Sequence, residues 1–210
     1  VHASPSNAKP NILLILADDL SWFDLGCYGS EDVRTPNIDK LAREGMTFTH
    51  AYTATAMCSP TRQQLYTGLF PARSGAMANH SSVKPGTRSM VHHLSELGYE
   101  VSLSGKEHFG PPESFPFERK QGLSIPYGPE PFCLVHASKK PHDGWPDARG
   151  YDPSALTVPP YLVDNLETRR SLSRYFTEIT ELDEEVKTLL SDLQAKGKAG
   201  NTVVIFTSEQ

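Results

Sequence analysis

The stretch NILLILA at residues 11–17 is of strand length and is continuously apolar after Asn11, and two aspartates, Asp18 and Asp19, follow it directly. A strand that is buried on both faces of a parallel sheet has a continuous hydrophobic sequence, whereas a half-exposed strand alternates apolar and polar residues. We therefore expect residues 11–17 to form a buried parallel strand. The two carboxylates would then stand at its carboxyl end.

Helices and strands are expected to alternate along the rest of the chain. The sequence indicates helices at residues 35–45, 59–68, 89–98 and 170–196, and strands at residues 100–104, 132–137 and 202–207. Residues 109–130 and the stretch up to about residue 165 lack a sustained period and are expected to be long loops. This order predicts an α/β fold with a mainly parallel sheet flanked by helices, in which ligands bind beyond the carboxyl ends of the strands.

Composition narrows the class of protein. The chain has 210 residues, a formal net charge of −5 and no apolar run long enough to cross a bilayer. A soluble globular protein without membrane insertion is therefore expected. The negative charge argues against a general nucleic-acid binder, because such proteins carry a basic stripe or a strongly basic domain. An anionic substrate would have to be attracted by local positive charge.

The cysteines and the N-terminus bear on the cellular compartment. Cys27, Cys58 and Cys133 cannot all pair, and they lack the close repeated spacing of a structural zinc site. Residues 1–6 have neither the basic start nor the apolar core of a signal peptide. We expect that a signal peptide has been removed and that the protein works in a periplasmic, secreted or lysosomal-type compartment.

The segment CSPTR at residues 58–62 is expected to begin a helix with a thiol at its tip. Ser59 would cap the free backbone N–H groups, and Pro60 suits the first helical position because it has no N–H to satisfy. Cys58 would then face the positive end of the helix dipole, where an anion is stabilised. Arg62 adds a planar cation suited to sulfate, phosphate or carboxylate. The alternative is an ordinary buried cysteine with an exposed arginine one turn later.

The ends of the first and last predicted strands carry oxygen ligands. Asp18 and Asp19 follow the first strand, and Glu209 and Gln210 come just after the last one. Carboxylate and amide oxygens suit Ca²⁺ or Mg²⁺ better than zinc or copper. A shared metal site requires these two strands to be close in space. The alternative for the adjacent Asp18 and Asp19 is that they cap a helix or face solvent.

Basic groups follow the other two strands. Lys106 and His108 are two residues apart, so their side chains would point the same way in an extended segment, and His142 follows the third strand. Each residue alone is expected more often to be solvated than functional. Together with Arg62 they would bind a tetrahedral oxyanion and donate a proton to a leaving oxygen.

The motif Cys58-Ser59-Pro60-Thr61-Arg62, followed by Leu65 and Thr67-Gly68, resembles the signature of the formylglycine-dependent sulfatases, which belong to the alkaline-phosphatase-like superfamily. The resemblance covers nearly the whole chain, including Asp18-Asp19 and Gly105-Lys106-Glu107-His108. The segments His108-Phe109-Gly110-Pro111 and Tyr151-Asp152-Pro153 are most similar to the sulfamidase and polysaccharide-sulfatase branch.

This resemblance implies a set of roles. Cys58 would be oxidised to formylglycine (3-oxoalanine) by a formylglycine-generating enzyme or another sulfatase maturase. Arg62 and Lys106 would stabilise the aldehyde hydrate and the sulfate, and His108 and His142 would act around the leaving group. Calcium, or magnesium in its place, would be held by Asp18, Asp19, the modified Cys58, Glu209 and Gln210. The last pair departs from the family's usual Asp followed by Asn or His, and it keeps oxygen ligands on longer side chains.

The expected activity is hydrolysis of sulfate esters, or of a sulfamate, on a sulfated sugar or polysaccharide. A phosphodiesterase or phosphonate monoester hydrolase with the same modified cysteine is the second interpretation, because tetrahedral phosphate satisfies the same cations. An inactive, truncated anion-binding scaffold is the third. Family members continue past this point with a second catalytic lysine, more strands and a smaller C-terminal domain. Residues 1–210 are therefore expected to be the N-terminal part of the catalytic domain, without its C-terminal remainder.

Overall fold

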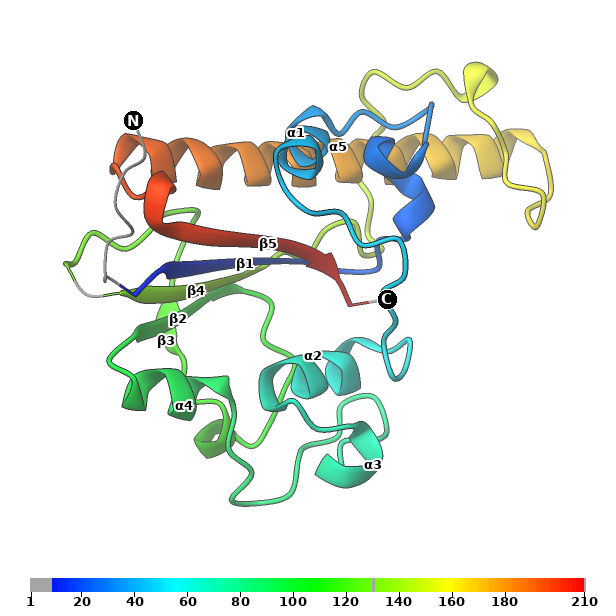
Figure 1. Ribbon diagram of the computed structural model, residues 1–210. Coiled ribbons are helices and arrows are strands. Elements are labelled where there is room, and N and C mark those ends of the chain that lie inside the picture. The colour runs from blue at the N-terminus through cyan, green and yellow to red at the C-terminus, as the bar shows by residue number, and fades with distance from the viewer. Residues whose placement is uncertain (1–8, 130, 210) are drawn as a thin grey trace.

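A five-stranded, all-parallel sheet forms the centre of the computed structural model, which describes residues 9–129 and 131–209 (Figure 1). The strand order is β3-β2-β4-β1-β5. The strands are β1 (Asn11–Ala17), β2 (Glu100–Gly105), β3 (Glu118–Lys120), β4 (Phe132–Ala137) and β5 (Thr202–Ser208). β1 lies between β4 and β5 and pairs in parallel with both, so the first and last strands are neighbours. The predicted α/β class is confirmed.

Helices cover both faces of the sheet, α5 and α1 on one side and α2, α3 and α4 on the other (Figure 1). The α-helices are α1 (Pro36–Glu44), α2 (Cys58–Thr67), α3 (Pro71–Ser74), α4 (Met90–Glu96) and α5 (Leu166–Ala195). Short 3-10 helices are η1 (Trp22–Asp24), η2 (Gly26–Tyr28), η3 (Pro112–Ser114), η4 (Pro153–Ala155) and η5 (Ala199–Asn201). None of the described helices has both the length and the apolar character needed to cross a bilayer.

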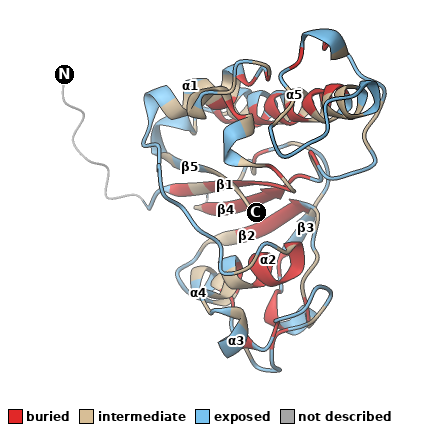
Figure 2. Cartoon of the chain, turned by 90° about the vertical axis from the view of Figure 1, so that its right-hand side faces the viewer, coloured by how far each residue is buried: buried red, intermediate tan, exposed pale blue. Residues whose placement is uncertain are grey.

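Strand β1 supplies side chains to two hydrophobic cores, one on each face of the sheet. Leu13 and Ile15 pack in the core that includes the apolar side of α5, and Leu14 and Leu16 pack in the core under α2 and α4. Figure 2 shows β1 as a largely buried strand in the middle of the molecule. Burying each of these side chains contributes about 1.5–3 kcal/mol. The continuous apolar sequence is therefore required by helices on both sides.

Two elements differ from the sequence predictions. α5 begins at Leu166, about one turn before the predicted start, because the side chain of Asn165 accepts a hydrogen bond from the Thr168 N–H and caps the helix. The predicted loop at 109–130 contains the 3-10 helix η3 and the edge strand β3. Three residues are too few to show a hydrophobic period, so the sequence gives no sign of β3.

Candidate active site

Helix α2 presents Cys58 at its first residue. The prediction that Ser59 caps this helix is wrong, because Met57 occupies the N-cap position and makes no side-chain cap hydrogen bond. The Ser59 hydroxyl instead donates to the Ser81 carbonyl and accepts from the Gln63 amide. Cys58 is only 7% exposed, so the thiol lies inside the protein.

The carboxylates predicted at the ends of the first and last strands meet at the start of α2. Ala17 of β1 is paired in register with Ser208 of β5, so Asp18 and Glu209 leave the sheet side by side. One ligand atom from each of Asp18, Asp19, Glu209 and Cys58 lies within 4.8 Å of the others. Gln210, the remaining predicted ligand, lies outside the described residues. The requirement that the first and last strands be close in space is met.

Two cations face these carboxylates. The Arg62 Nη2 atom lies 3.4 Å from Asp18 Oδ1, and its Nε atom contacts the Glu209 carboxylate. Its Nη1 atom donates to the Lys106 carbonyl at 3.2 Å. The Lys106 Nζ atom donates to Asp18 Oδ2 at 2.5 Å. Arg62 is 0% exposed, so the alternative of an exposed surface arginine is wrong.

Burial controls the protonation of the cluster. Burial and the adjacent Asp18 raise the pKa of Glu209 to about 8. Burial opposes ionisation of Asp18, but the Glu209 carboxyl, the Lys106 ammonium and the Arg62 guanidinium together hold the pKa of Asp18 below its usual value. Burial and then Glu209 raise the pKa of Cys58 to about 12. At neutral pH the thiol is therefore protonated, and the site does not hold a thiolate nucleophile.

The donor set fits a hard divalent cation. Asp18 Oδ1 and both carboxylate oxygens of Glu209 are buried, and among the described residues the Arg62 guanidinium faces these carboxylates as an ion pair without forming a hydrogen bond of good geometry to them. Buried carboxylate oxygens cost free energy unless hydrogen bonds or ions satisfy them. Calcium and magnesium prefer such oxygen ligands. Asp18, Asp19 and Glu209 are therefore the described residues best able to hold a metal ion beside Cys58.

The two predicted histidines differ in their contacts. His142 Nε2 is 3.7 Å from Asp19 Oδ2, which adds His142 to the site. His108 departs from the extended conformation that was expected to align it with Lys106, because its φ is +52°. Lys106 reaches Asp18, whereas His108 Nε2 contacts Nδ1 of His80 at 2.8 Å. The sequence prediction missed His80, which lies in an irregular segment with no motif or period.

Backbone conformation supports the location of the site. Among the described residues, the non-glycine residues with positive φ are Asp19, His80 and His108, at +62°, +62° and +52°. This region of backbone space is unfavourable for side chains with a Cβ atom and is concentrated at functional sites. All three residues contact the predicted cluster or one of its histidines.

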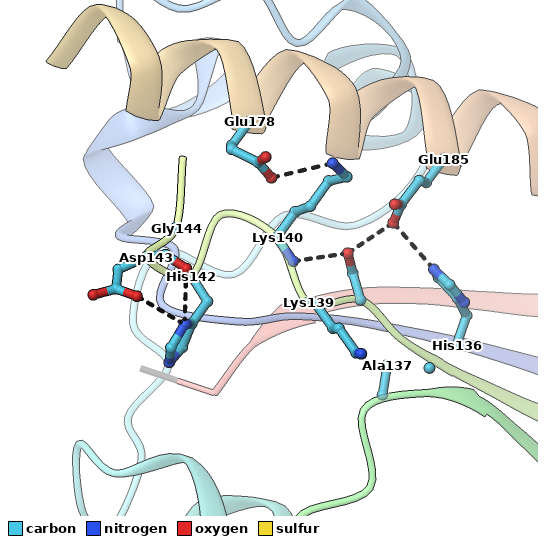
Figure 3. Close-up of a pocket in the computed structure, with 11 residues that line it drawn as sticks. His136, Ala137, Lys139, Lys140, His142, Asp143, Gly144, Glu178 and Glu185 are labelled. Carbon is cyan, nitrogen blue, oxygen red and sulfur yellow. Dashed lines mark hydrogen bonds and ion pairs between the residues drawn. The ribbon is translucent and has the colours of Figure 1, made fainter. Parts of the chain in front are cut away.

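A cavity of about 430 Å³ opens beside the site, at the carboxyl end of β4 (Figure 3). Its lining includes His142, Lys139 and Lys140. The Lys140 ammonium is paired with Glu178 and Glu181 of α5, so this lysine is directed away from the carboxylate cluster. The cavity therefore shares His142 with the candidate site and offers room for part of a ligand.

The comparisons with known proteins bear on the fold and on the family of the chain. A family described as "Sulfatase" matches residues 10–129 and 127–209, and the chain belongs to this family. This confirms the resemblance found in the sequence.

Named relatives and solved structures make the similarity more specific. An ulvan-active sulfatase from Formosa agariphila is 34% identical over 99% of this chain and 46% of its own length. Human N-sulphoglucosamine sulphohydrolase is 29% identical over 96% of this chain and 51% of its own length. The structure of a putative sulfatase from Bacteroides fragilis superposes with a TM-score of 0.79 at 23% identity, covering 100% of this chain and 63% of that one. The chain thus spans about half the length of the curated relatives it matches.

Proposed function

We propose that this chain is the N-terminal part of a sulfatase catalytic domain that hydrolyses sulfate esters, or a sulfamate, on a sulfated carbohydrate. Membership of the sulfatase family supports the reaction class. Relatives named ulvan-active sulfatase, N-sulphoglucosamine sulphohydrolase and N-acetylgalactosamine-6-sulfatase support a carbohydrate substrate. The observation that carries the proposal is the meeting of Cys58 with three carboxylates within 4.8 Å at the tip of α2.

The residues of the cluster fit the two groups that a sulfatase of this kind uses. Asp18, Asp19 and Glu209, with Gln210 next in the chain, would hold calcium, and Cys58 would be converted to formylglycine by a maturase. When both are present, calcium would make a hydroxyl group of the hydrated aldehyde acidic enough to lose its proton and serve as the nucleophile toward sulfur. The pKa of about 12 makes the unmodified Cys58 thiol a poor nucleophile at neutral pH.

The two cations of the cluster would have different roles. Arg62 is fully buried and contacts Asp18 and Glu209, so it acts by fixing these carboxylates. The Lys106 side chain is 18% exposed and lies at the edge of the cluster, so its ammonium is the cation better placed to meet a sulfate oxygen. His142, beside the cavity, and His108 would donate a proton to the leaving oxygen or nitrogen.

The first experiment determines the state of residue 58. Trypsin releases residues 44–62 as one peptide, whose mass distinguishes a thiol from an aldehyde. Protein from the native host should carry the aldehyde. A persistent thiol together with no turnover would instead support the inactive anion-binding scaffold.

The second experiment compares turnover of an aryl sulfate and an aryl phosphodiester by the whole protein with calcium. Faster turnover of the sulfate is expected, and it should be lost in Cys58→Ala. Cys27→Ala is the matched control, because Cys27 is half-buried outside the cluster. A strong preference for the phosphodiester would favour the phosphodiesterase or phosphonate hydrolase instead.

A further inference from the structure

Two imidazoles form a hydrogen-bonded pair at the edge of the candidate site. His108 Nε2 and His80 Nδ1 are 2.8 Å apart, and the ring centroids are 4.6 Å apart. His80 is exposed, whereas His108 is half-buried. The Nδ1 atom of His108 is buried and has no hydrogen-bond partner among the described residues. The pair therefore connects solvent, through His80, to a buried ring nitrogen whose hydrogen-bonding capacity is unused among the described residues.

The protein holds this pair in place from helix α2. Both histidines have left-handed backbone conformations, which need support from their surroundings. Gln63 of α2 provides it, because its Nε2 atom donates to the carbonyl of Ser81, next to His80. Its Oε1 atom accepts from the N–H of Gly110, two residues after His108. One buried side chain thus ties both histidine segments to the helix that begins at Cys58.

We propose that His80 is a positioning residue that passes a proton from solvent to His108 for delivery to the leaving group. The N–H bond at His108 Nδ1 breaks as the leaving oxygen or nitrogen gains this proton. At the same time His108 Nε2 takes the proton from Nδ1 of a protonated His80. His108 ends in its other neutral tautomer, and His80 ends neutral and is recharged from water. This inference rests on the proposed function, and it names the source of the proton that the leaving group receives.

The charges around His108 favour such a relay over a permanently charged His108. Lys106, Arg62 and His80 disfavour a positive charge on this ring, and Asp18 favours it. Burial first, and then Lys106 and His80, lower the pKa of His108 below its usual value. A neutral His108 is a weak acid alone. It becomes an effective donor when a second imidazole supplies a proton to its other nitrogen.

Three variants separate a relay from a structural contact. His80→Asn keeps a side-chain donor and tolerates positive φ, but it cannot carry a proton. His80→Gly tolerates the same backbone and leaves space for added imidazole. His93→Asn is the matched control, because His93 is an exposed histidine on α4.

Turnover of an aryl sulfate by the whole protein should fall about 10-fold or more in His80→Asn and His80→Gly, with KM nearly unchanged and the acid side of the pH profile shifted. Free imidazole should restore turnover in His80→Gly but not in His80→Asn. The relay would be overturned if His80→Asn kept the turnover and the pH profile of the wild type. It would also be overturned if imidazole did not restore turnover in His80→Gly.

Nitrogen NMR of the histidine rings tests the pair without turnover. The midpoint of the His108 titration should differ from the wild-type midpoint in His80→Asn. It should equal the wild-type midpoint in His93→Asn. If His108 is unaffected by His80→Asn, the relay is overturned whether or not the protein hydrolyses sulfate. If His108 changes but the wild-type protein has no turnover, the proposed function fails while the coupling of the two histidines stands.

Discussion

Gln63 is the residue whose replacement most directly tests how the site is held together. Its side chain is fully buried and contacts three segments of the chain. Its Nε2 atom donates to the Ser59 hydroxyl at 2.9 Å and to the Ser81 carbonyl at 2.8 Å. Its Oε1 atom accepts from the N–H groups of Val83 at 3.0 Å and Gly110 at 3.4 Å.

Gln63→Leu removes these hydrogen bonds while keeping a side chain of similar size. The Val83 N–H keeps the Gly110 carbonyl as a partner, and the Ser81 carbonyl keeps the Ser59 hydroxyl. The Gly110 N–H is left without its described partner. One orphaned buried group costs about 1–3 kcal/mol, and the other lost bonds add about 1 kcal/mol. We therefore expect the free energy of unfolding to fall by about 2–4 kcal/mol.

Urea unfolding of the whole protein measures this change, and Gln64→Leu is the matched control. Gln64 is the next residue on the same helix, and its side chain accepts one exposed hydrogen bond, from the Ala54 N–H. The control should lose less than about 1 kcal/mol. Equal midpoints for the two variants would refute the idea that Gln63 anchors the histidine segments.

Three further predictions concern the charged groups. Arg62→Lys should lower turnover by about 10²-fold, measured with an aryl sulfate, because a point charge cannot contact Asp18, Glu209 and the Lys106 carbonyl together; unchanged turnover would contradict it. Calcium at 100 times its dissociation constant should raise the free energy of unfolding by about 2.7 kcal/mol, measured by thermal unfolding. This gain should vanish in Asp18→Asn. It should persist in the control Asp143→Asn, because the Asp143 side chain is 89% exposed. Burial opposes ionisation of Glu185, but His136 and Ser138 hold the pKa of Glu185 below its usual value. The ionised carboxylate therefore stabilises the fold above pH ~4.3, and this stabilisation is lost as the pH falls through the lower pKa of the folded state. The difference in free energy of unfolding between wild type and Glu185→Gln should narrow below pH ~4.3, and a difference that widens in acid would contradict the assignment.

The fold could be predicted because its strongest signals are local. A strand covered by helices on both faces must be apolar along its buried length, and residues 12–17 are all apolar. The long helix α5 has a clear apolar stripe because one side of it packs on the sheet. The edge strand β3 has three residues, of which Glu118 and Arg119 are exposed, so no pattern of burial marks it.

The carboxylate cluster could be predicted only in part. The sequence places Asp18 and Glu209 after strands, but their meeting depends on β5 pairing with β1 across 191 positions of the chain. Parallel pairing at such a distance is fixed by which apolar faces the helices cover, and local residue patterns do not encode it. The resemblance to the sulfatase signature was needed to predict that the ends of these strands lie beside Cys58.

The histidine pair shows what a motif search leaves out. His108 follows a strand and was predicted, whereas His80 lies in a segment whose conformation is set by hydrogen bonds to Gln63 and Ser59 on another element. The left-handed backbone of His80 is unfavourable in isolation, so the surrounding contacts must determine it. Those contacts come from the first turns of α2, the same turns that carry Cys58 and Arg62. The buried polar residues of this helix thus have two tasks, since they present the thiol and also order the segment that brings a second imidazole to His108.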